Sequence, residues 1–153
     1  MADWKRPLQA IPVGKGRKVC DGDEVAILTI GAIGNEAVKA VTQLSSEGIN
    51  PAHYDLRFVK PLDEELLHEV FKKFKKVITV EDGCLVGGMG SAVLEFMADK
   101  GYAAEVKRLG IPDKIVEHGD QQELYAECHY DAKAIAGSVK SMVEGSTAKL
   151  LAI

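Results

Sequence analysis

The chain has 153 residues, of which 46% are hydrophobic and 27% charged, and its formal net charge is −4. This length is typical of one domain with its own core, and the composition is ordinary for a soluble globular protein. The acidic balance argues against a broad basic surface for nucleic acid, and no apolar run approaches the roughly 20 residues that span a bilayer. We therefore expect neither a nucleic acid nor a membrane as partner.

The three cysteines, Cys20, Cys84 and Cys128, lie far apart and form no Cys-x-x-Cys pair. This spacing predicts neither a disulfide framework nor a thiolate metal site and is typical of a reducing compartment. The four histidines show no metal-ligand spacing, and the first residues have no apolar core of the kind found in signal peptides. We expect a cytoplasmic protein in which this chain binds no metal.

Residues 1–16 are rich in proline, glycine and scattered charge, and we interpret them as an extended lead-in from a preceding domain. At its end, residues 14–18 look like a phosphate-binding loop, but no helix start follows them, so a solvated turn is favoured. The pattern predicts one domain over residues 17–144 and a short tail over residues 145–153.

Strands are predicted at residues 18–20, 25–30, 52–59, 77–80 and 104–109. Helices are predicted from about Asn35 to Gly48, from Pro61 to the lysines at 72–76, from a Ser91 cap to Gly101, and over residues 121–128 and 132–143. Alternation of strands and helices implies a mostly parallel sheet with helices on both faces. The fold class is therefore α/β, a three-layer α/β/α sandwich.

Asp55 and Arg57 fall two residues apart in the predicted third strand and so share one face of it. Because parallel strands are commonly covered on both faces, the two charges are expected to be partly buried. A structural ion pair is favoured, either between them or from Arg57 to a neighbouring strand. A contact with another domain or subunit is the functional alternative. If Arg57 completes a buried pair, Arg57→Ala should cost about 2–4 kcal/mol.

The segment from Val77 to Met97 reads as a buried strand, a glycine loop and a helix. Glu81 and Asp82 come at the strand's carboxyl end, where open α/β sheets usually build their sites. The glycines that follow are Gly83, Gly87, Gly88 and Gly90. Such a loop can cradle a phosphate, but the two carboxylates at its mouth would repel one. Close packing of a helix or a neighbouring subunit is favoured.

Motifs for catalysis are missing from the sequence. There is no nucleophile elbow, no His-Glu-x-x-His, no P-loop, and no Gly-Asp-Gly followed by the Asn that holds the magnesium of thiamine diphosphate. The residues by themselves predict no catalytic, cofactor-binding or metal-binding side chain.

Two stretches nevertheless resemble the carboxy-terminal domain of transketolase-like thiamine diphosphate enzymes. They are residues 54–63, with Asp-Leu-Arg and Pro-Leu-Asp, and residues 80–90, with Val-Glu-Asp-Gly and Gly-Gly-Met-Gly. Residues 109–125, with Ile11 to Gly16 at the front, are similar to the 1-deoxy-D-xylulose-5-phosphate synthase branch of that superfamily. The resemblance covers roughly residues 8–143.

The resemblance implies a five-stranded mixed sheet whose first short strand is antiparallel to the rest. It implies a full-length transferase that condenses pyruvate with glyceraldehyde 3-phosphate and releases carbon dioxide, for isoprenoid, thiamine and pyridoxal biosynthesis. Thiamine diphosphate and Mg²⁺ would lie in its other two domains. This third domain would support the homodimer and the preceding domains, and it would be inert alone.

The expected interdomain or subunit interface comprises the polar and glycine positions singled out above: Asp55, Arg57, Glu81, Asp82, Gly87, Gly88 and Gly90. Two alternatives stay open. One is a stand-alone module that binds a nucleotide or an acyl carrier at the loop from Gly83 to Gly90. The other is the carboxy-terminal domain of a 2-oxo acid dehydrogenase beta subunit, against which the segment after Leu109 argues.

Overall fold

The computed structural model describes residues 9–150, with side chains through Gly145. The strands are β1 (Arg17–Cys20), β2 (Asp23–Ile30), β3 (Pro51–Asp55), β4 (Lys76–Cys84) and β5 (Glu105–Ile111). The helices are the 3-10 turn η1 (Gly31–Ile33), α1 (Gly34–Ser46), α2 (Glu64–Lys73), α3 (Met89–Asp99), α4 (Gln121–Glu127) and α5 (Ala132–Leu150). Within residues 9–150, no helix is both long and apolar enough to cross a membrane.

The five strands form one sheet in the order β1-β3-β2-β4-β5. β1 runs antiparallel to β3, and all other neighbours are parallel. The mixed sheet and its antiparallel first strand are therefore confirmed. The apolar second strand lies at the centre of the sheet, as its near-continuous hydrophobic run predicts.

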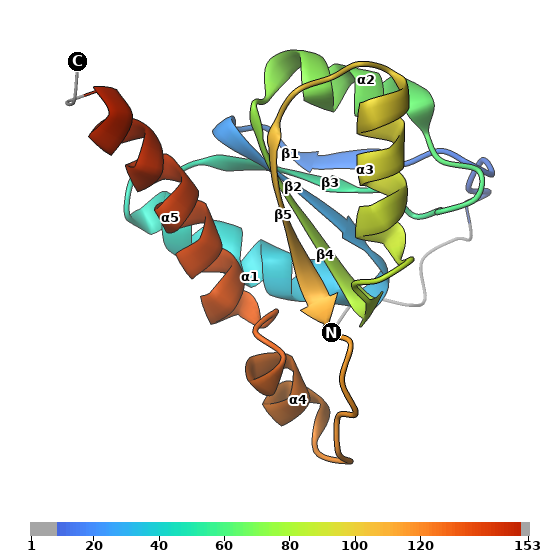
Figure 1. The fold of residues 1–153 in the computed structure, drawn as a ribbon, viewed down its shortest axis with the longest axis vertical. Helices are drawn as coiled ribbons and strands as arrows, with labels where there is room; N and C mark the ends of the chain where they lie inside the picture. Colours follow the sequence, from blue (N-terminus) through green and yellow to red (C-terminus); the bar gives the residue numbers. More distant parts are fainter. Residues whose placement is uncertain (1–8, 151–153) are drawn as a thin grey trace.

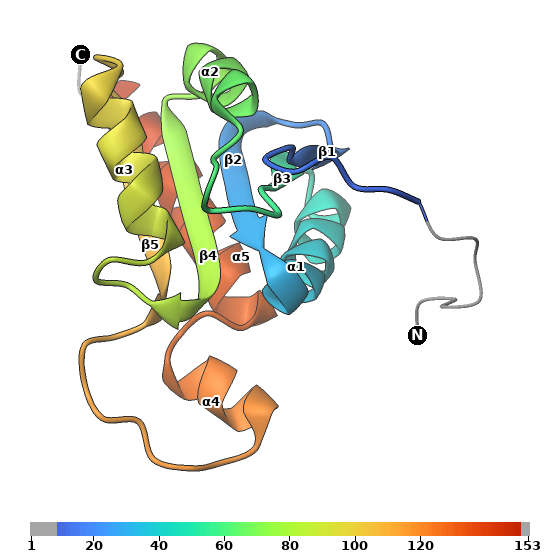
Figure 2. The same cartoon turned by 90° about the vertical axis from the view of Figure 1, so that its right-hand side faces the viewer.

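Helices cover both faces of the sheet, which confirms the three-layer sandwich (Figures 1 and 2). Alternate residues of β2 supply the two cores. Val25 and Ile27 pack beneath α1 and α5, while Ala26 and Leu28 pack beneath α2 and α3. All four are at most 1% exposed. One strand therefore joins the two cores.

The start of α2 shows how local sequence sets an element boundary. The Asp63 carboxylate accepts a hydrogen bond from the backbone N–H of Leu66 at 3.3 Å, which makes Asp63 the N-cap. Glu64 and Glu65 occupy the first turn, where the helix dipole favours negative charge. Pro61 was expected inside this first turn, but it precedes the helix because Asp63 caps it.

β3 is shorter than expected, since it ends at Asp55 instead of continuing to residue 59. Its pairing with both neighbours stops there: Arg17 of β1 and Thr29 of β2 both lie opposite Asp55. Beyond this point the backbone turns away, and Arg57 adopts a φ of +59°. The Leu56 N–H still donates to the Thr29 carbonyl at 2.8 Å, but pairing with β1 has ended at Arg17, so β3 does not continue as an interior strand.

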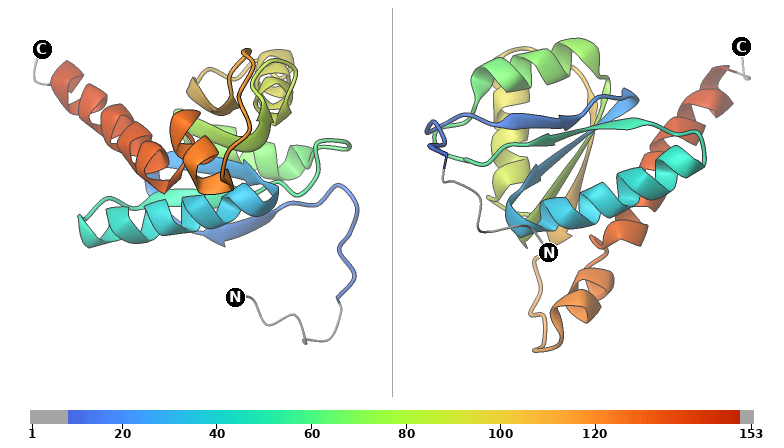
Figure 3. Two further views of the ribbon diagram at one scale, coloured as in Figure 1. Left: turned by 90° about the horizontal axis from the view of Figure 1, so that it is seen from below. Right: turned by 180° about the vertical axis from the view of Figure 1, so that it is seen from behind.

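α5 is longer than expected and continues to Leu150, through residues that the sequence analysis assigned to a tail. Residues 151–153 of that tail lie outside the described part of the chain. Figures 1 and 3 show that the end of α5 extends past the sheet, while its first half lies beside α1.

Candidate interface at the carboxyl end of the sheet

The carboxyl ends of the parallel strands bring the expected site residues to one edge of the molecule. Asp55 ends β3, while Glu81 and Asp82 lie near the end of β4. The turn into α1 and the loop into α3 complete this edge. In open α/β sheets this is where ligands and partners usually bind.

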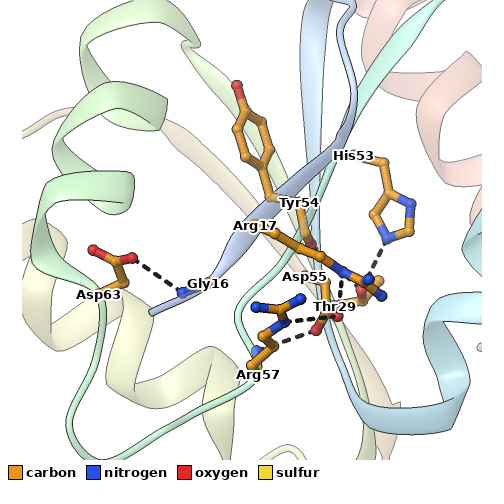
Figure 4. A network of polar contacts seen from close by, with 8 residues as sticks. All are labelled: Gly16, Arg17, Thr29, His53, Tyr54, Asp55, Arg57 and Asp63. Atoms are coloured by element: carbon orange, nitrogen blue, oxygen red, sulfur yellow. Dashed lines mark hydrogen bonds and ion pairs between the residues drawn. The ribbon is translucent and has the colours of Figure 1, made fainter. Parts of the chain in front are cut away.

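Asp55 pairs mainly with an arginine that the sequence did not single out (Figure 4). Arg17 Nε lies 3.1 Å from its carboxylate, whereas Arg57 Nε lies 4.0 Å away. The backbone N–H of Arg57 also donates to Asp55 at 3.1 Å. The Arg57 side chain is 26% exposed and that of Arg17 is 58% exposed. The expected pair between Asp55 and Arg57 is therefore weak and open to solvent.

Glu81 fills the position at which the glycine loop could have held an anion. Its carboxylate, 4% exposed, accepts hydrogen bonds from the backbone N–H groups of Met89 at 2.6 Å and Gly90 at 2.9 Å. These amides form the N-terminus of α3, the end that attracts negative charge. The chain itself thus supplies the anion at this helix end.

Gly88 and Gly90 permit close packing of the loop and α3 within the chain, in agreement with the interpretation that the sequence favoured. A Cβ at Gly88 would lie 2.2 Å from the Glu81 carboxylate and from the Cys84 carbonyl, and one at Gly90 would lie 2.6 Å from Thr79 Oγ1. Gly90 is itself buried. Gly87 is exposed, with a φ of +75° and open space around it.

Ser91 does not cap α3, contrary to expectation. The helix begins at Met89, so Ser91 lies in its first turn. Its hydroxyl accepts hydrogen bonds from Gly87 N–H and Arg108 and donates to the carbonyl of Leu85. Ser91 therefore holds the glycine loop in place, while Glu81 caps the helix.

Asp82 points the other way, toward α4 and the turn that follows it. Its carboxylate accepts hydrogen bonds from the hydroxyls of Tyr125 at 2.9 Å and Tyr130 at 3.0 Å. Burial, followed by the hydrogen bond to Asp82, raises the pKa of Tyr125 to about 12, and the same causes raise the pKa of Tyr130. Both phenols therefore remain donors at neutral pH.

The α4–α5 segment closes the crevice at the topological switch point. The strand order reverses between β2 and β4, which is where a doubly wound sheet normally leaves room for a ligand. Here Tyr125 and Tyr130 attach this segment to Asp82 near the end of β4. The N–H of Ala132 donates to Glu36 of α1 at 3.2 Å. The chain therefore fills this crevice with its own residues.

His53 lies beneath α1, close to the Asp55 end of β3 (Figure 4). It is 2% exposed, and its Nε2 lies 2.9 Å from Thr29 Oγ1. Burial lowers the pKa of His53 to about 4, although the Asp55 carboxylate opposes the shift. His53 is therefore neutral at physiological pH.

Arg17, Tyr125 and Tyr130 were missed by sequence reasoning because their partners are remote in the chain. The tyrosines lie 43 and 48 residues from Asp82, and Arg17 lies 38 residues from Asp55. Only the strand register could have revealed the pairing of Arg17 with Asp55. Nothing in the sequence around the tyrosines indicates their common partner.

Comparison with known proteins agrees with the fold. Residues 14–135 match the family model described as "Transketolase, C-terminal domain". The chain is 64% identical over 142 residues to 1-deoxy-D-xylulose-5-phosphate synthase of Cytophaga hutchinsonii, covering 93% of this chain and 22% of that protein. It is 54% identical over 140 residues to the synthase of Parabacteroides distasonis, covering 92% of this chain and 22% of the relative. The chain thus spans about a fifth of the length of these relatives.

Solved structures give the same result. A split-gene transketolase described as an inactive beta4 tetramer superposes with a TM-score of 0.80 and 28% identity, over 88% of this chain and 44% of that one. The transketolase of Campylobacter jejuni superposes with a TM-score of 0.61 over 89% of this chain and 20% of that one, and its 14% identity shows the fold alone. The chain belongs to the family of transketolase C-terminal domains.

Proposed function

We propose that this chain is the carboxy-terminal domain of a 1-deoxy-D-xylulose-5-phosphate synthase. The observation that carries the proposal is 64% identity over nearly the whole chain to a synthase of which the chain covers only 22%. The complete enzyme would condense pyruvate with glyceraldehyde 3-phosphate and release carbon dioxide. Its product would serve isoprenoid, thiamine and pyridoxal biosynthesis in the cytoplasm.

In this proposal the domain supports the enzyme's architecture and carries no step of the reaction. The described residues do not fit thiamine diphosphate and Mg²⁺. Within residues 9–150, no group of three His, Cys, Asp or Glu side chains could hold a metal ion. Glu81 occupies the helix end that a diphosphate would need. The cofactor and the metal would therefore bind to the rest of the enzyme.

The carboxyl edge of the sheet is the proposed contact with the preceding domains and the second subunit of a homodimer. Asp82 and Gly87 are exposed there, and Asp55 and Arg57 are partly exposed. Glu81, Gly88 and Gly90 would contribute to the contact indirectly. They hold in place the loop that carries Val86, whose side chain is 69% exposed.

Two other functions are disfavoured by specific observations. A stand-alone nucleotide or acyl-carrier module would need free amides at the loop from Gly83 to Gly90, and Glu81 accepts from two of them. A 2-oxo acid dehydrogenase beta subunit is disfavoured because the curated relatives described above are synthases.

An activity comparison tests the proposal. The 153-residue chain and the longer polypeptide that ends with it would each be assayed with pyruvate, glyceraldehyde 3-phosphate, thiamine diphosphate and Mg²⁺. We expect turnover from the longer polypeptide and none from the chain alone, as in the inactive tetramer of the split-gene transketolase. Turnover by the isolated chain, or a longer polypeptide inactive as a synthase, would refute it.

A further inference from the structure

A groove of about 90 Å³ lies between β1 and α1, at the lateral edge of the sheet that β1 forms. β1 contributes Arg17 and Val19 to it, α1 contributes Val38, and β3 contributes His53 and Asp55. Although both valines are apolar, Val19 is 41% exposed and Val38 is 45% exposed. The described residues therefore leave an apolar surface open to solvent on both walls of this groove.

The same groove contains a polar atom whose hydrogen-bonding capacity is not used. The His53 side chain is 2% exposed, and none of the described residues forms a hydrogen bond with its Nδ1. The other ring nitrogen, Nε2, lies 2.9 Å from the Thr29 hydroxyl (Figure 4). Buried polar atoms in folded proteins nearly always have a partner, so each exception requires an explanation. Together with the exposed valines, this atom indicates a surface that another part of a larger protein completes.

The lead-in reaches the domain at this groove. Arg17 both begins β1 and lines the groove, so the chain entering the domain passes it within one residue. The N–H of Gly16 donates to the Asp63 carboxylate at 3.0 Å, and Lys15 Nζ lies 3.4 Å from the same group. These contacts hold the lead-in on the side of the molecule that carries β1 and α1 (Figure 2). Asp55, which belongs to the contact edge proposed above, also lines the groove, so the groove continues that edge.

Tethering favours an occupant from the same polypeptide over a second subunit. This chain covers only 22% of the synthase from Cytophaga hutchinsonii, so most of such an enzyme would precede it. The 16 residues before Arg17 would then be the linker, and a short flexible linker gives an effective concentration of about millimolar. A groove of about 90 Å³ is too small to hold a separate protein by itself, whereas it can receive a segment tethered this closely.

We propose that a segment of the polypeptide preceding this chain packs an apolar side chain between Val19 and Val38 and closes the groove over His53. The inference rests on the proposed function, because it requires that preceding part. Val19 and Val38 would then be positioning contacts between domains, and they would take no part in the reaction.

Photo-cross-linking tests the proposal in the longer polypeptide that ends with this chain. p-Benzoylphenylalanine replaces Val38, and mass spectrometry identifies the peptide that becomes joined to it. We expect a link to a peptide upstream of Met1 within the same molecule, so the product keeps the mass of one polypeptide on a denaturing gel. The same group at position 115 is the control. Ile115 is also exposed, but it follows β5 at the other edge of the sheet and should not join that peptide.

Methyl NMR of the wild-type sequence gives a second measurement, which needs no substitution. In the 153-residue chain, a neutral gadolinium chelate should broaden the methyl resonances of Val19 and Val38. In the longer polypeptide this broadening should be lost. Equal broadening in both lengths would overturn the proposal, and so would protection that is already present in the 153-residue chain.

A cross-link that joins two polypeptides would also overturn the proposal, because the second subunit would then be the occupant. Synthase activity of the unmodified longer polypeptide is measured separately. Its absence would refute the proposed function, whereas the cross-link and the methyl resonances decide whether the preceding polypeptide fills the groove.

Discussion

Glu81 and Asp82 show how adjacent residues of the same charge acquire different roles. The Glu81 side chain is buried against the amides of α3, while Asp82 faces the two tyrosines. Successive side chains near the end of a strand point to opposite sides, so one carboxylate stabilises the fold and the other remains available. The sequence places both at the strand end but does not separate their roles.

Arg57 is the first residue for which the structure changes the expected stability effect. The expected cost of 2–4 kcal/mol for Arg57→Ala assumed a buried pair, and the 4.0 Å contact is partly exposed. We now expect Arg57→Ala to cost less than about 1 kcal/mol. Because φ is +59°, Arg57→Gly should be about 1 kcal/mol more stable than Arg57→Ala. Urea unfolding of the two variants measures this difference, and an Ala variant equal to or better than Gly would contradict it.

His53 predicts how stability depends on pH. Its pKa is about 4 in the folded chain and about 6.5 when unfolded, so the unfolded state takes up the proton first as pH falls. The contribution of His53 to the free energy of unfolding is complete above pH 6.5 and is lost as pH falls toward 4. Between pH 7.5 and 5.0 the free energy of unfolding should fall by about 2 kcal/mol.

Urea unfolding at both pH values checks this expectation. His53→Gln should reduce the fall in the free energy of unfolding between the two pH values. His118→Gln, at an exposed position, should leave that fall unchanged. Equal pH dependence in wild type and His53→Gln would show that His53 does not cause it.

At the scale of elements, the junction between β4 and α3 depends on a glycine, Gly88, which has no side chain. The carbonyl of Cys84 and the carboxylate of Glu81 both lie within 2.2 Å of where a Cβ at Gly88 would be. The backbone carbonyl cannot move far without breaking the junction, and Glu81 cannot move without losing its amide partners. The helix α3 can therefore begin at Met89 only if the residue at position 88 has no Cβ.

Gly88→Ala should cost about 2 kcal/mol or more, because it overfills this junction. Gly137→Ala is the matched control, since Gly137 is exposed within α5 and a Cβ there would meet nothing within 4 Å. The control should gain about 0.5–1 kcal/mol from the better helix propensity of alanine. Thermal unfolding distinguishes them, and a neutral Gly88→Ala would refute the close-packing interpretation.

At the scale of the whole molecule, the two cores of the described domain lie on opposite faces of one sheet. β2 contributes Ile27 to one and Leu28 to the other, and both side chains are fully buried. Loss of packing on either face therefore weakens the strand that the other face requires. We expect the described domain to unfold as one cooperative unit.

Ile27→Ala and Leu28→Ala should each cost about 2–5 kcal/mol through the cavity that they leave. Each variant should still show one transition, with coincident far-UV and near-UV circular dichroism, because both faces share β2. Two separate transitions in either variant would show that the layers unfold independently.

The sequence predicts the fold class and the central second strand, and it places the candidate interface residues Glu81 and Asp82 at the carboxyl end of a strand. Hydrophobic periodicity and glycine positions carry this information locally, so it can be read without coordinates. It misplaced the ends of β3, α2 and α5, because strand ends depend on available partners and helix ends on caps and packing.

Which polar residues remain accessible depends on contacts that form only in the folded chain. Arg17 and the two tyrosines reach their partners across 38 to 48 residues, and no local pattern encodes such distances. The closing of the switch-point crevice by the α4–α5 segment likewise depends on where the last helices dock. Sequence reasoning could therefore identify this edge, whereas spatial proximity determined that Glu81 is used internally and that Asp82 faces two tyrosines.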